Sequence, residues 1–227
     1  MPADTTSHPA RFVTFEGGEG VGKSTQVRRL VARLGASGIP AVRTREPGGT
    51  PKAEAIRSFL LQGRSESWGP GGEAVLFAAA RLDHVNTLIA PALAAGKWVV
   101  CDRFADSTRA YQGVGGGLDE TLIDGLETLA LNGHVPDLTF VLDMDPDLAF
   151  ERVRERAIAD GLSLLGDRFE KEDLDFHRRL RDSFLDIAAR NPERCVVLSA
   201  DTGEDALADA IWQAVVARYP HIPGDGA

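Results

Sequence analysis

The chain has 227 residues, of which 43% are hydrophobic and 26% charged, and its formal net charge is -9. This length and apolar content predict one α/β domain with a buried core and argue against a second full domain. The acidic balance argues against nucleic acid and against an anionic membrane surface as partners, because polyanions would be repelled. A small anionic ligand is still compatible with this balance where basic residues are locally concentrated.

The two ends of the chain are polar, and the first ten residues lack the apolar core of a signal peptide. No apolar run approaches the length that a membrane-spanning helix needs. We therefore expect a cytoplasmic protein with one domain over 11–219 and flexible tails at 1–10 and 220–227. Cys101 and Cys195 each lie in an apolar run typical of a core strand. Reduced structural thiols are the expected state, and a disulfide between them is the less favoured alternative.

The first motif follows an apolar alternating run at 11–16 that predicts a strand. It reads Gly-Gly-Glu-Gly-Val-Gly-Lys-Ser and matches G-x-x-x-x-G-K-[ST], in which backbone N–H groups cradle phosphate, the lysine reaches the β/γ-phosphates and the serine offers a hydroxyl to Mg²⁺. A glycine-rich turn with a chance lysine is the alternative, but strand, motif and helical pattern follow in the correct order. The expected nucleotide-binding residues are Gly17, Gly18, Glu19, Gly20, Val21, Gly22, Lys23, Ser24 and Thr25.

Helix and strand patterns alternate along the rest of the chain. Apolar runs predict further strands at 41–45, 98–102, 138–142 and 195–198. A Gly/Ser-rich stretch at 63–72 predicts a loop, and the glycines at 113–117 are expected to end a short helix. This alternation predicts a five-stranded parallel sheet with helices on both faces. The expected helices are 22–37, 51–61, 73–95, 106–112, 118–131, 146–156, 171–190 and 204–218.

Three polar segments stand where parallel strands end. They are the glycine-rich loop at Gly17, the turn that begins at Arg45, and the pair Asp102 and Arg103. Ligands of such a sheet bind outside the carboxyl ends of the strands, so the three segments are expected to meet on one crevice.

Together these segments resemble the thymidylate kinase family. The resemblance is carried by Phe-Glu-Gly-Gly-Glu-Gly-Val-Gly-Lys-Ser-Thr from Phe15, Thr-Arg-Glu-Pro-Gly-Gly-Thr from Thr44 and Asp-Arg-Phe-Ala-Asp-Ser-Thr-Arg-Ala-Tyr-Gln-Gly from Asp102, and it extends over 11–218. It implies a P-loop NTPase fold with a small lid and transfer of the γ-phosphate of ATP to dTMP, which yields dTDP and ADP for dTTP biosynthesis. It also implies Mg²⁺ and a homodimer built through helices such as 73–95.

The resemblance assigns one set of residues to dTMP. Arg45 and Arg103 would hold the acceptor phosphate with bidentate guanidinium groups, and ion pairs with acids such as Glu46 or Asp106 are the alternative. Phe77 would stack on thymine, although periodicity alone favours a core role for it. By resemblance, Glu19 approaches the 3′-hydroxyl and Tyr111 lies beneath the deoxyribose. The expected dTMP-binding residues are Glu19, Arg45, Phe77, Arg81, Arg103, Thr108, Tyr111 and Gln112.

Catalysis would need no strong base, because a phosphate monoester with a second pKa of about 6 is largely ionised near neutrality. Lys23, Mg²⁺ and arginines would meet the charge on the transferring group. Asp102 is expected either to organise Mg²⁺ through water or to orient Arg103. The variable positions of the loop hold no arginine, so a lid over about 152–170 would supply it. The catalytic candidates are Lys23, Arg103, Arg156 and Arg168, chosen over Arg152 and Arg154, and the metal candidates are Ser24, Asp102 and Glu170.

Two other functions remain open at this point. The chain could be another P-loop nucleoside or nucleotide kinase, whose acceptor is a sugar hydroxyl or a different nucleotide. It could also be a regulatory module whose ATP hydrolysis switches a partner surface, although the arginine pair argues against this. The segment 201–203 is expected to contact adenine, and no Asn-Lys-x-Asp motif for guanine is present, which favours ATP over GTP.

Overall fold

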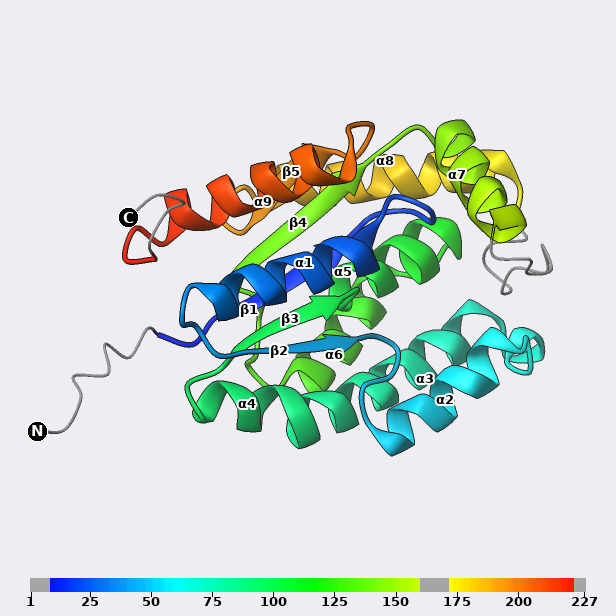
Figure 1. The fold of residues 1–227 in the computed structure, drawn as a ribbon. Coiled ribbons are helices and arrows are strands. Elements are labelled where there is room, and N and C mark those ends of the chain that lie inside the picture. Colours follow the sequence, from blue (N-terminus) through cyan, green and yellow to red (C-terminus); the bar gives the residue numbers. More distant parts are fainter. Residues whose placement is uncertain (1–8, 160–171, 223–227) are drawn as a thin grey trace, which may run out of the picture.

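Within residues 9–159 and 172–222, which the computed structural model describes, five strands form one sheet in the order β2-β3-β1-β4-β5. Every neighbouring pair is parallel, so the predicted five-stranded parallel sheet is confirmed (Figure 1). All strand carboxyl ends therefore point to one edge. The strands are β1 (Phe12–Glu16), β2 (Ala41–Arg45), β3 (Trp98–Asp102), β4 (Leu138–Asp143) and β5 (Cys195–Ser199).

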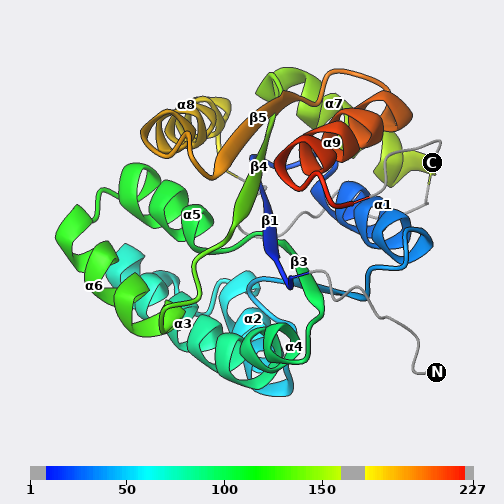
Figure 2. The ribbon, with the colours of Figure 1, turned by 90° about the vertical axis from the view of Figure 1, so that its left-hand side faces the viewer.

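Helices cover both faces of this sheet, as Figure 2 shows, with α1 and α9 on one side and α5, α6 and α8 on the other. Phe15 belongs to a buried cluster with Leu30 of α1 and Ile211 of α9, whereas Phe12, three residues earlier in the strand, packs with Ile89 on the opposite face. This alternation buries both faces, as parallel sheets require. The helices are α1 (Lys23–Ala36), α2 (Pro51–Leu61), α3 (Gly69–His84), α4 (Ala90–Ala94), α5 (Ala105–Thr108), α6 (Glu120–Leu131), α7 (Pro146–Ala159), α8 (Leu174–Arg190) and α9 (Glu204–Arg218).

The segment before β3 differs from its prediction. Helix α3 begins at Gly69 inside the predicted loop 63–72, because a proline in the first turn of a helix forfeits no internal hydrogen bond. A short 3₁₀ turn, Glu66–Trp68, precedes it. The predicted helix 73–95 is also interrupted by a π-helical turn, Val85–Ile89, just before Pro91 of α4. A proline lacks the N–H that a regular helix would use there.

The helical path after α5 ends among the glycines at 113–117, as predicted, although it first extends to Gly115. Wider π-type turns continue through Arg109–Gly115. A Cβ on Gly115 would lie 2.8 Å from Cε2 of Phe176, and a Cβ on Gly116 would lie 2.7 Å from Cβ of Pro70. Besides ending the helix, these glycines therefore allow close packing against neighbouring elements.

Both predicted tails are partly attached to the core. Trp98 Nε1 donates to the carbonyl of Pro9 at 3.1 Å. At the other end, Ile222 is only 2% exposed and belongs to the cluster that contains Trp98. Cys101 and Cys195 are free and buried, as predicted. In the described part of the chain, no helix combines the length and the apolar character needed to cross a bilayer.

Candidate active site

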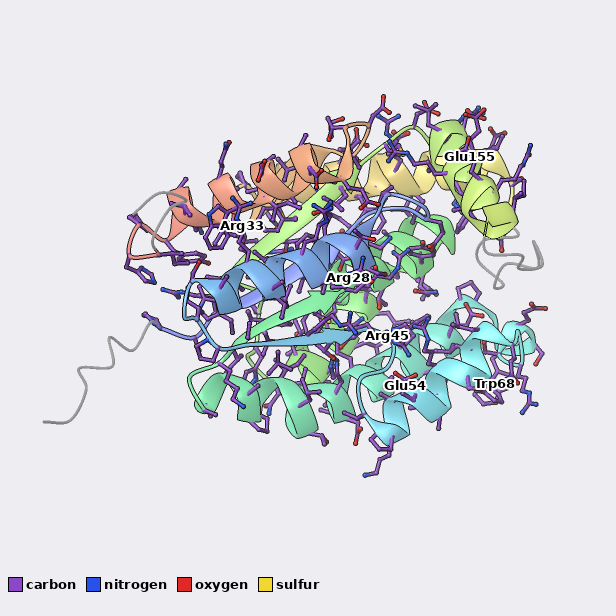
Figure 3. All side chains as sticks on the ribbon, viewed as in Figure 1. Arg28, Arg33, Arg45, Glu54, Trp68 and Glu155 are labelled. Carbon is purple, nitrogen blue, oxygen red and sulfur yellow. The ribbon has the colours of Figure 1, made fainter. Side chains whose placement is uncertain are left out.

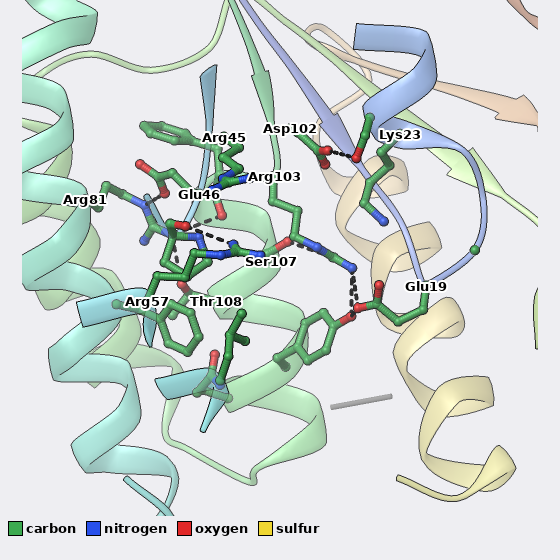
Figure 4. Close-up of a pocket in the computed structure, with 18 of the residues that line it drawn as sticks. Glu19, Lys23, Arg45, Glu46, Arg57, Arg81, Asp102, Arg103, Ser107 and Thr108 are labelled. Atoms are coloured by element: carbon green, nitrogen blue, oxygen red, sulfur yellow. Dashed lines mark hydrogen bonds and ion pairs between the residues drawn. The ribbon is translucent and has the colours of Figure 1, made fainter. Parts of the chain in front are cut away.

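A cavity of about 290 Å³ opens at the carboxyl ends of β1, β2 and β3 (Figure 4). Its walls come from the glycine-rich loop, the turn after β2, helices α2 and α3, and the segment after β3. Three segments far apart in sequence thus meet on one crevice, as their positions at strand ends predicted. The structure brings all of the residues predicted for the acceptor nucleotide to this cavity: Glu19, Arg45, Phe77, Arg81, Arg103, Thr108, Tyr111 and Gln112.

The glycine-rich loop packs so closely against β4 and α7 that two of its glycines could not carry a side chain. Gly17 has φ +130° and Gly20 has φ +72°, and a Cβ at either position would lie within 2.5 Å of a backbone carbonyl oxygen. Lys23 reaches back over the loop and donates from Nζ to the carbonyls of Gly17 and Gly18. Its ammonium group is buried, and burial together with the neighbouring Arg103 lowers the pKa of Lys23 to about 8, against the opposing attraction of Glu19.

Ser24 and Asp102, the two predicted metal ligands inside the described residues, meet directly. Ser24 Oγ donates a hydrogen bond to the Asp102 carboxylate, one of the contacts drawn in Figure 4. The β1–β3 register pairs Phe15 with Asp102 and so places that carboxylate beside the start of α1. Hydroxyl and carboxylate oxygens are the donors that Mg²⁺ prefers.

Arg103 joins the loop to the segment after β3. Its Nη1 donates to the carbonyl of Gly17 at 2.9 Å, and its Nη2 donates to Glu19 at 2.6 Å and to the Tyr111 hydroxyl at 3.0 Å. Tyr111 in turn donates to Glu19 at 2.8 Å. Burial raises the pKa of Glu19, but Arg103 and Lys23 outweigh it and lower the value to about 2. The carboxylate is therefore charged and locked in place.

A buried acid that sequence reasoning missed supports the backbone of Arg103. Arg103 has φ +68°, a left-handed conformation that is unusual for a residue with a side chain. Glu16 at the end of β1 accepts hydrogen bonds from Phe104 N at 2.7 Å and from Ser107 Oγ at 2.6 Å. Burial and the nearby Asp106 raise the pKa of Glu16 to about 7, although Ser107 opposes the shift. Glu16 thus ties down the turn that aims Arg103.

The far end of the cavity is lined by Phe77 and Arg81 of α3. Phe77 packs against the cluster that includes Tyr111 and Phe184, and it also lines the cavity, so the core role and the site role apply together. Arg81 is 2% exposed and donates from Nε to Glu46 at 2.7 Å and from Nη2 to Thr108 Oγ1 at 3.0 Å. This end combines an aromatic ring with fixed donors.

Arg45 occupies the open side of the cavity. Its Nη2 donates to both carboxylate oxygens of Glu54 at 3.1 Å, and Figure 3 shows the two side chains near one another at the surface. The two alternative partners considered from sequence are engaged elsewhere, Glu46 with Arg81 and Asp106 with Arg194. Because the Arg45–Glu54 pair is exposed, an incoming anion could replace the carboxylate at little cost.

Comparison with known proteins decides the family. A protein-family model described as thymidylate kinase matches residues 15–211. The chain belongs to the thymidylate kinase family. It is 52% identical over 209 residues to a thymidylate kinase of Rhodopseudomonas palustris, covering 92% of this chain and 89% of that protein. It is 51% identical over 207 residues to a thymidylate kinase of Caulobacter vibrioides, covering 91% and 96%.

A solved structure agrees with these relatives. The crystal structure of thymidylate kinase from Ehrlichia chaffeensis superposes with a TM-score of 0.73 at 33% sequence identity, covering 92% of this chain and all of that one. The three motifs therefore identified the thymidylate kinase family correctly, and the P-loop fold expected with it is confirmed.

Some residues around the thymidylate kinase cavity were not predicted. Arg57 of α2 lines it and donates from Nη1 to the carbonyl of Pro47 at 3.0 Å. Its one available signal was its place on the helix that directly follows the Arg45 turn. The other unpredicted lining residues are Glu46, Pro47, Leu61, Phe104 and Ser107.

The predicted lid lies only partly within the described residues. Arg168 and Glu170 lie outside the described residues, and so does the side chain of Arg156, whose backbone belongs to α7. Arg152 is turned toward the segment predicted to contact adenine, because its Nη1 donates to the carbonyl of Ala200 at 2.8 Å and its Nη2 lies 3.7 Å from Asp201.

Proposed function

We propose that the protein is a thymidylate kinase that transfers the γ-phosphate of ATP to dTMP and yields dTDP and ADP for dTTP biosynthesis. One observation carries this proposal: the phosphate-binding loop with Lys23 and all of the acceptor residues chosen from sequence line a single cavity. A donor phosphate on the loop and an acceptor phosphate on Arg45 and Arg103 would thus face each other at close range.

On the donor side, residues 17–25 hold the phosphates of ATP, and Lys23 carries positive charge to the transferring group. Ser24 and Asp102 fit Mg²⁺, because their oxygens are in contact beside the loop, and Asp102 would act through water. When bound, Mg²⁺ would neutralise charge on the β- and γ-phosphates. The sequence alone supports Glu170 as a third metal residue and Arg156 and Arg168 as catalytic lid arginines.

On the acceptor side, Arg45 and Arg103 hold the phosphate of dTMP, and Phe77 and Arg81 hold the base. Glu19 and Tyr111 contact the sugar, while Thr108 and Gln112 complete the pocket. No side chain has to remove a proton, because the acceptor phosphate is already ionised near neutrality. The residues therefore act by positioning two anions and by stabilising the charge that develops between them.

A coupled ADP-release assay tests this function directly. Purified protein with ATP and Mg²⁺ is offered dTMP, dUMP, dCMP, dGMP and thymidine in turn, and kcat/KM is expected to be highest for dTMP. Activity on thymidine with none on dTMP would establish a nucleoside kinase instead. Binding of ATP without transfer to any acceptor would establish a regulatory module.

Phe77→Ala is expected to raise KM for dTMP at least about fivefold, because stacking on an aromatic side chain contributes about 1–3 kcal/mol per base. KM for ATP and kcat should stay within about twofold, since the change removes binding shared by ground and transition states. Steady-state kinetics measure all three constants. Phe59→Ala is the matched control, because Phe59 packs on Trp68 of the neighbouring turn and should leave KM for dTMP unchanged.

We also propose that the protein forms a homodimer through α3 and α6. We further propose that it is cytoplasmic, and that its single kinase domain spans 11–219 with a lid at about 152–170. Support for the interface comes from apolar side chains that are exposed on these two helices: Val75 at 52%, Leu122 at 46% and Leu129 at 65%. Leu122 and Leu129 are seven residues apart and so share one face of α6. Support for the location comes from two free, buried cysteines.

Leu129→Glu is expected to convert a dimer of about twice 24.3 kDa into a monomer, because it places a charge in the centre of the apolar contact. Size-exclusion chromatography with light scattering measures the mass. Val197→Glu is the control, since Val197 is also apolar and is 45% exposed but lies on the edge strand β5. A wild-type protein that elutes at the mass of one chain would contradict the dimer.

A further inference from the structure

The carboxylate of Glu46 is shared between two residues of α3. Its Oε2 accepts from Arg81 Nε at 2.7 Å, and its Oε1 accepts from His84 Nδ1 at 2.9 Å. All three side chains are buried, with 4% exposure for Glu46, 3% for Arg81 and none for His84. Because a carboxylate oxygen only accepts in this geometry, Nδ1 is the ring nitrogen that carries a proton.

The other side of the histidine ring contacts the turn after β2. His84 Nε2 lies 2.6 Å from Thr44 Oγ1, and a Cβ on Gly49 would approach Nε2 to 2.6 Å. The ring therefore fills the space between α3 and the turn, and glycine at position 49 leaves room for it. These contacts leave the imidazole ring little freedom to rotate away from Glu46.

Arg81 is held by its remaining contacts in one orientation. Nη2 donates to the carbonyl of Phe104 and to Thr108 Oγ1, both at 3.0 Å, and the guanidinium lies 5.3 Å from the centre of the Phe104 ring. Within the described residues, no hydrogen bond reaches Nη1, so this nitrogen is the donor left for a ligand in the cavity. Figure 4 shows Arg81 beside Glu46 at the wall of that cavity.

Arg81 and Glu46 are joined by one hydrogen bond rather than by two. Guanidinium and carboxylate groups prefer a two-bond fork, in which Nε and Nη2 would bind both oxygens of one carboxylate. Here His84 takes Oε1, so Nη2 is free to bind Phe104 and Thr108 instead. Without the histidine donor, Oε1 would be buried and unpaired and would draw Nη2 away from these two acceptors. The guanidinium would then rotate and move Nη1 off the cavity.

We propose that His84 is a positioning residue for base recognition, which acts through the shared Glu46 carboxylate to hold Arg81 Nη1 toward the base end of the cavity. This inference rests on the proposed function, which assigns Arg81 to the base of dTMP. His84 does not line the cavity and is proposed to contact neither nucleotide. Its contribution is the orientation of one donor, so its loss affects dTMP and leaves ATP alone.

Two amide variants separate the two sides of the ring. In His84→Asn the side-chain amide occupies the place of Nδ1 and can still donate to Glu46, whereas in His84→Gln it reaches the place of Nε2 and can contact only Thr44. His84→Gln is expected to raise KM for dTMP about tenfold, the effect of one charge-assisted hydrogen bond, with kcat and KM for ATP within about twofold. His84→Asn should restore KM to within about threefold. Equal effects, the reverse order or a parallel loss for ATP would overturn the proposal.

A double-mutant cycle tests whether His84 acts through Arg81. Arg81→Lys alone should raise KM for dTMP, and adding His84→Gln to it should change KM by less than about twofold. A further tenfold rise would overturn the role of His84 while leaving the function intact. If Arg81→Lys leaves KM for dTMP unchanged, the assignment of Arg81 to the base is wrong and the inference falls with it. Turnover of dTMP by the wild type is measured separately, and it tests the proposed function independently of the role of His84.

Glu46→Gln keeps the test valid if His84→Gln does not fold. An amide offers one acceptor to two donors, so it should raise KM for dTMP as His84→Gln does and leave KM for ATP unchanged. Thermal unfolding of each variant establishes that it is folded before kinetics are compared. A folded Glu46→Gln protein with wild-type KM for dTMP would overturn the proposal.

Discussion

Lys23→Ala is expected to lower kcat by about a thousandfold or more, one of the two largest effects expected of a single change in this protein. The ammonium group is buried and fixed by the carbonyls of Gly17 and Gly18, so its charge is held in place and little exposed to solvent. Removing one preorganised charge or donor from such a site costs about 10²–10³ in rate, and in phosphoryl transfer the charge lies on the group being moved. Single-turnover and steady-state kinetics with saturating ATP and dTMP measure the loss.

Lys52→Ala is the matched control for Lys23, because Lys52 is 85% exposed at the start of α2 and is expected to leave kcat within about twofold. The pH profile gives a second readout. Burial and Arg103 lower the pKa of Lys23 to about 8, so the charged form is lost as pH rises through that value, and kcat/KM for ATP should fall above about pH 8. Lys23→Arg, which stays charged, should lack this alkaline fall. A loss of less than tenfold in Lys23→Ala would contradict the role given to the ammonium group.

The strands and the site motifs could be predicted from sequence because each depends on local pattern. Runs such as Trp98 to Asp102 are apolar, rich in β-branched residues and closed by turns, and β3 begins and ends where that pattern does. The start of α3 was harder to predict, because Gly69 and Pro70 are typical of a loop, although the first turn of a helix tolerates both. The glycines at 115 and 116 end their helix as predicted, but a second role of these residues could not be read from the sequence. That role is close contact with Phe176 and Pro70, which are distant in sequence.

The pairings inside the site needed the fold. Motif spacing named Glu19 and Arg103 separately, but nothing in the sequence says that their side chains lie 2.6 Å apart. The partner of Arg45 is likewise Glu54, one helical turn into α2, rather than either acid considered beforehand. Burial explains these limits: Glu16 and His84 look like ordinary members of a strand and a helix until the sheet and α3 enclose them. Roles that depend on a shared partner therefore appear only once the tertiary contacts are known.

Arg103→Lys is expected to lower kcat/KM for dTMP by about a thousandfold, because one guanidinium makes contacts that a single ammonium cannot span. Arg103 binds Gly17, Glu19 and Tyr111 from two nitrogens in a fixed plane. A lysine offers a point charge on a flexible stem and loses the fork that would meet the acceptor phosphate. An arginine at the transferring phosphoryl group contributes about 10³–10⁵ in kcat. Initial rates over a matrix of dTMP and ATP concentrations give the constants.

Arg109→Lys is the matched control, since Arg109 makes comparable ion pairs with Asp124 and Glu127 and does not line the cavity. It should keep kcat/KM for dTMP within about twofold. Arg103 has two functions, binding the phosphate and binding the loop, and Glu19→Gln separates them. In this variant the guanidinium keeps its charge for the phosphate but loses its ion pair with the loop. We expect a smaller loss there, about tenfold and mostly in KM for dTMP. An Arg103→Lys enzyme within tenfold of the wild type would mean that charge alone suffices, and that the anchored plane of the guanidinium contributes nothing to transfer.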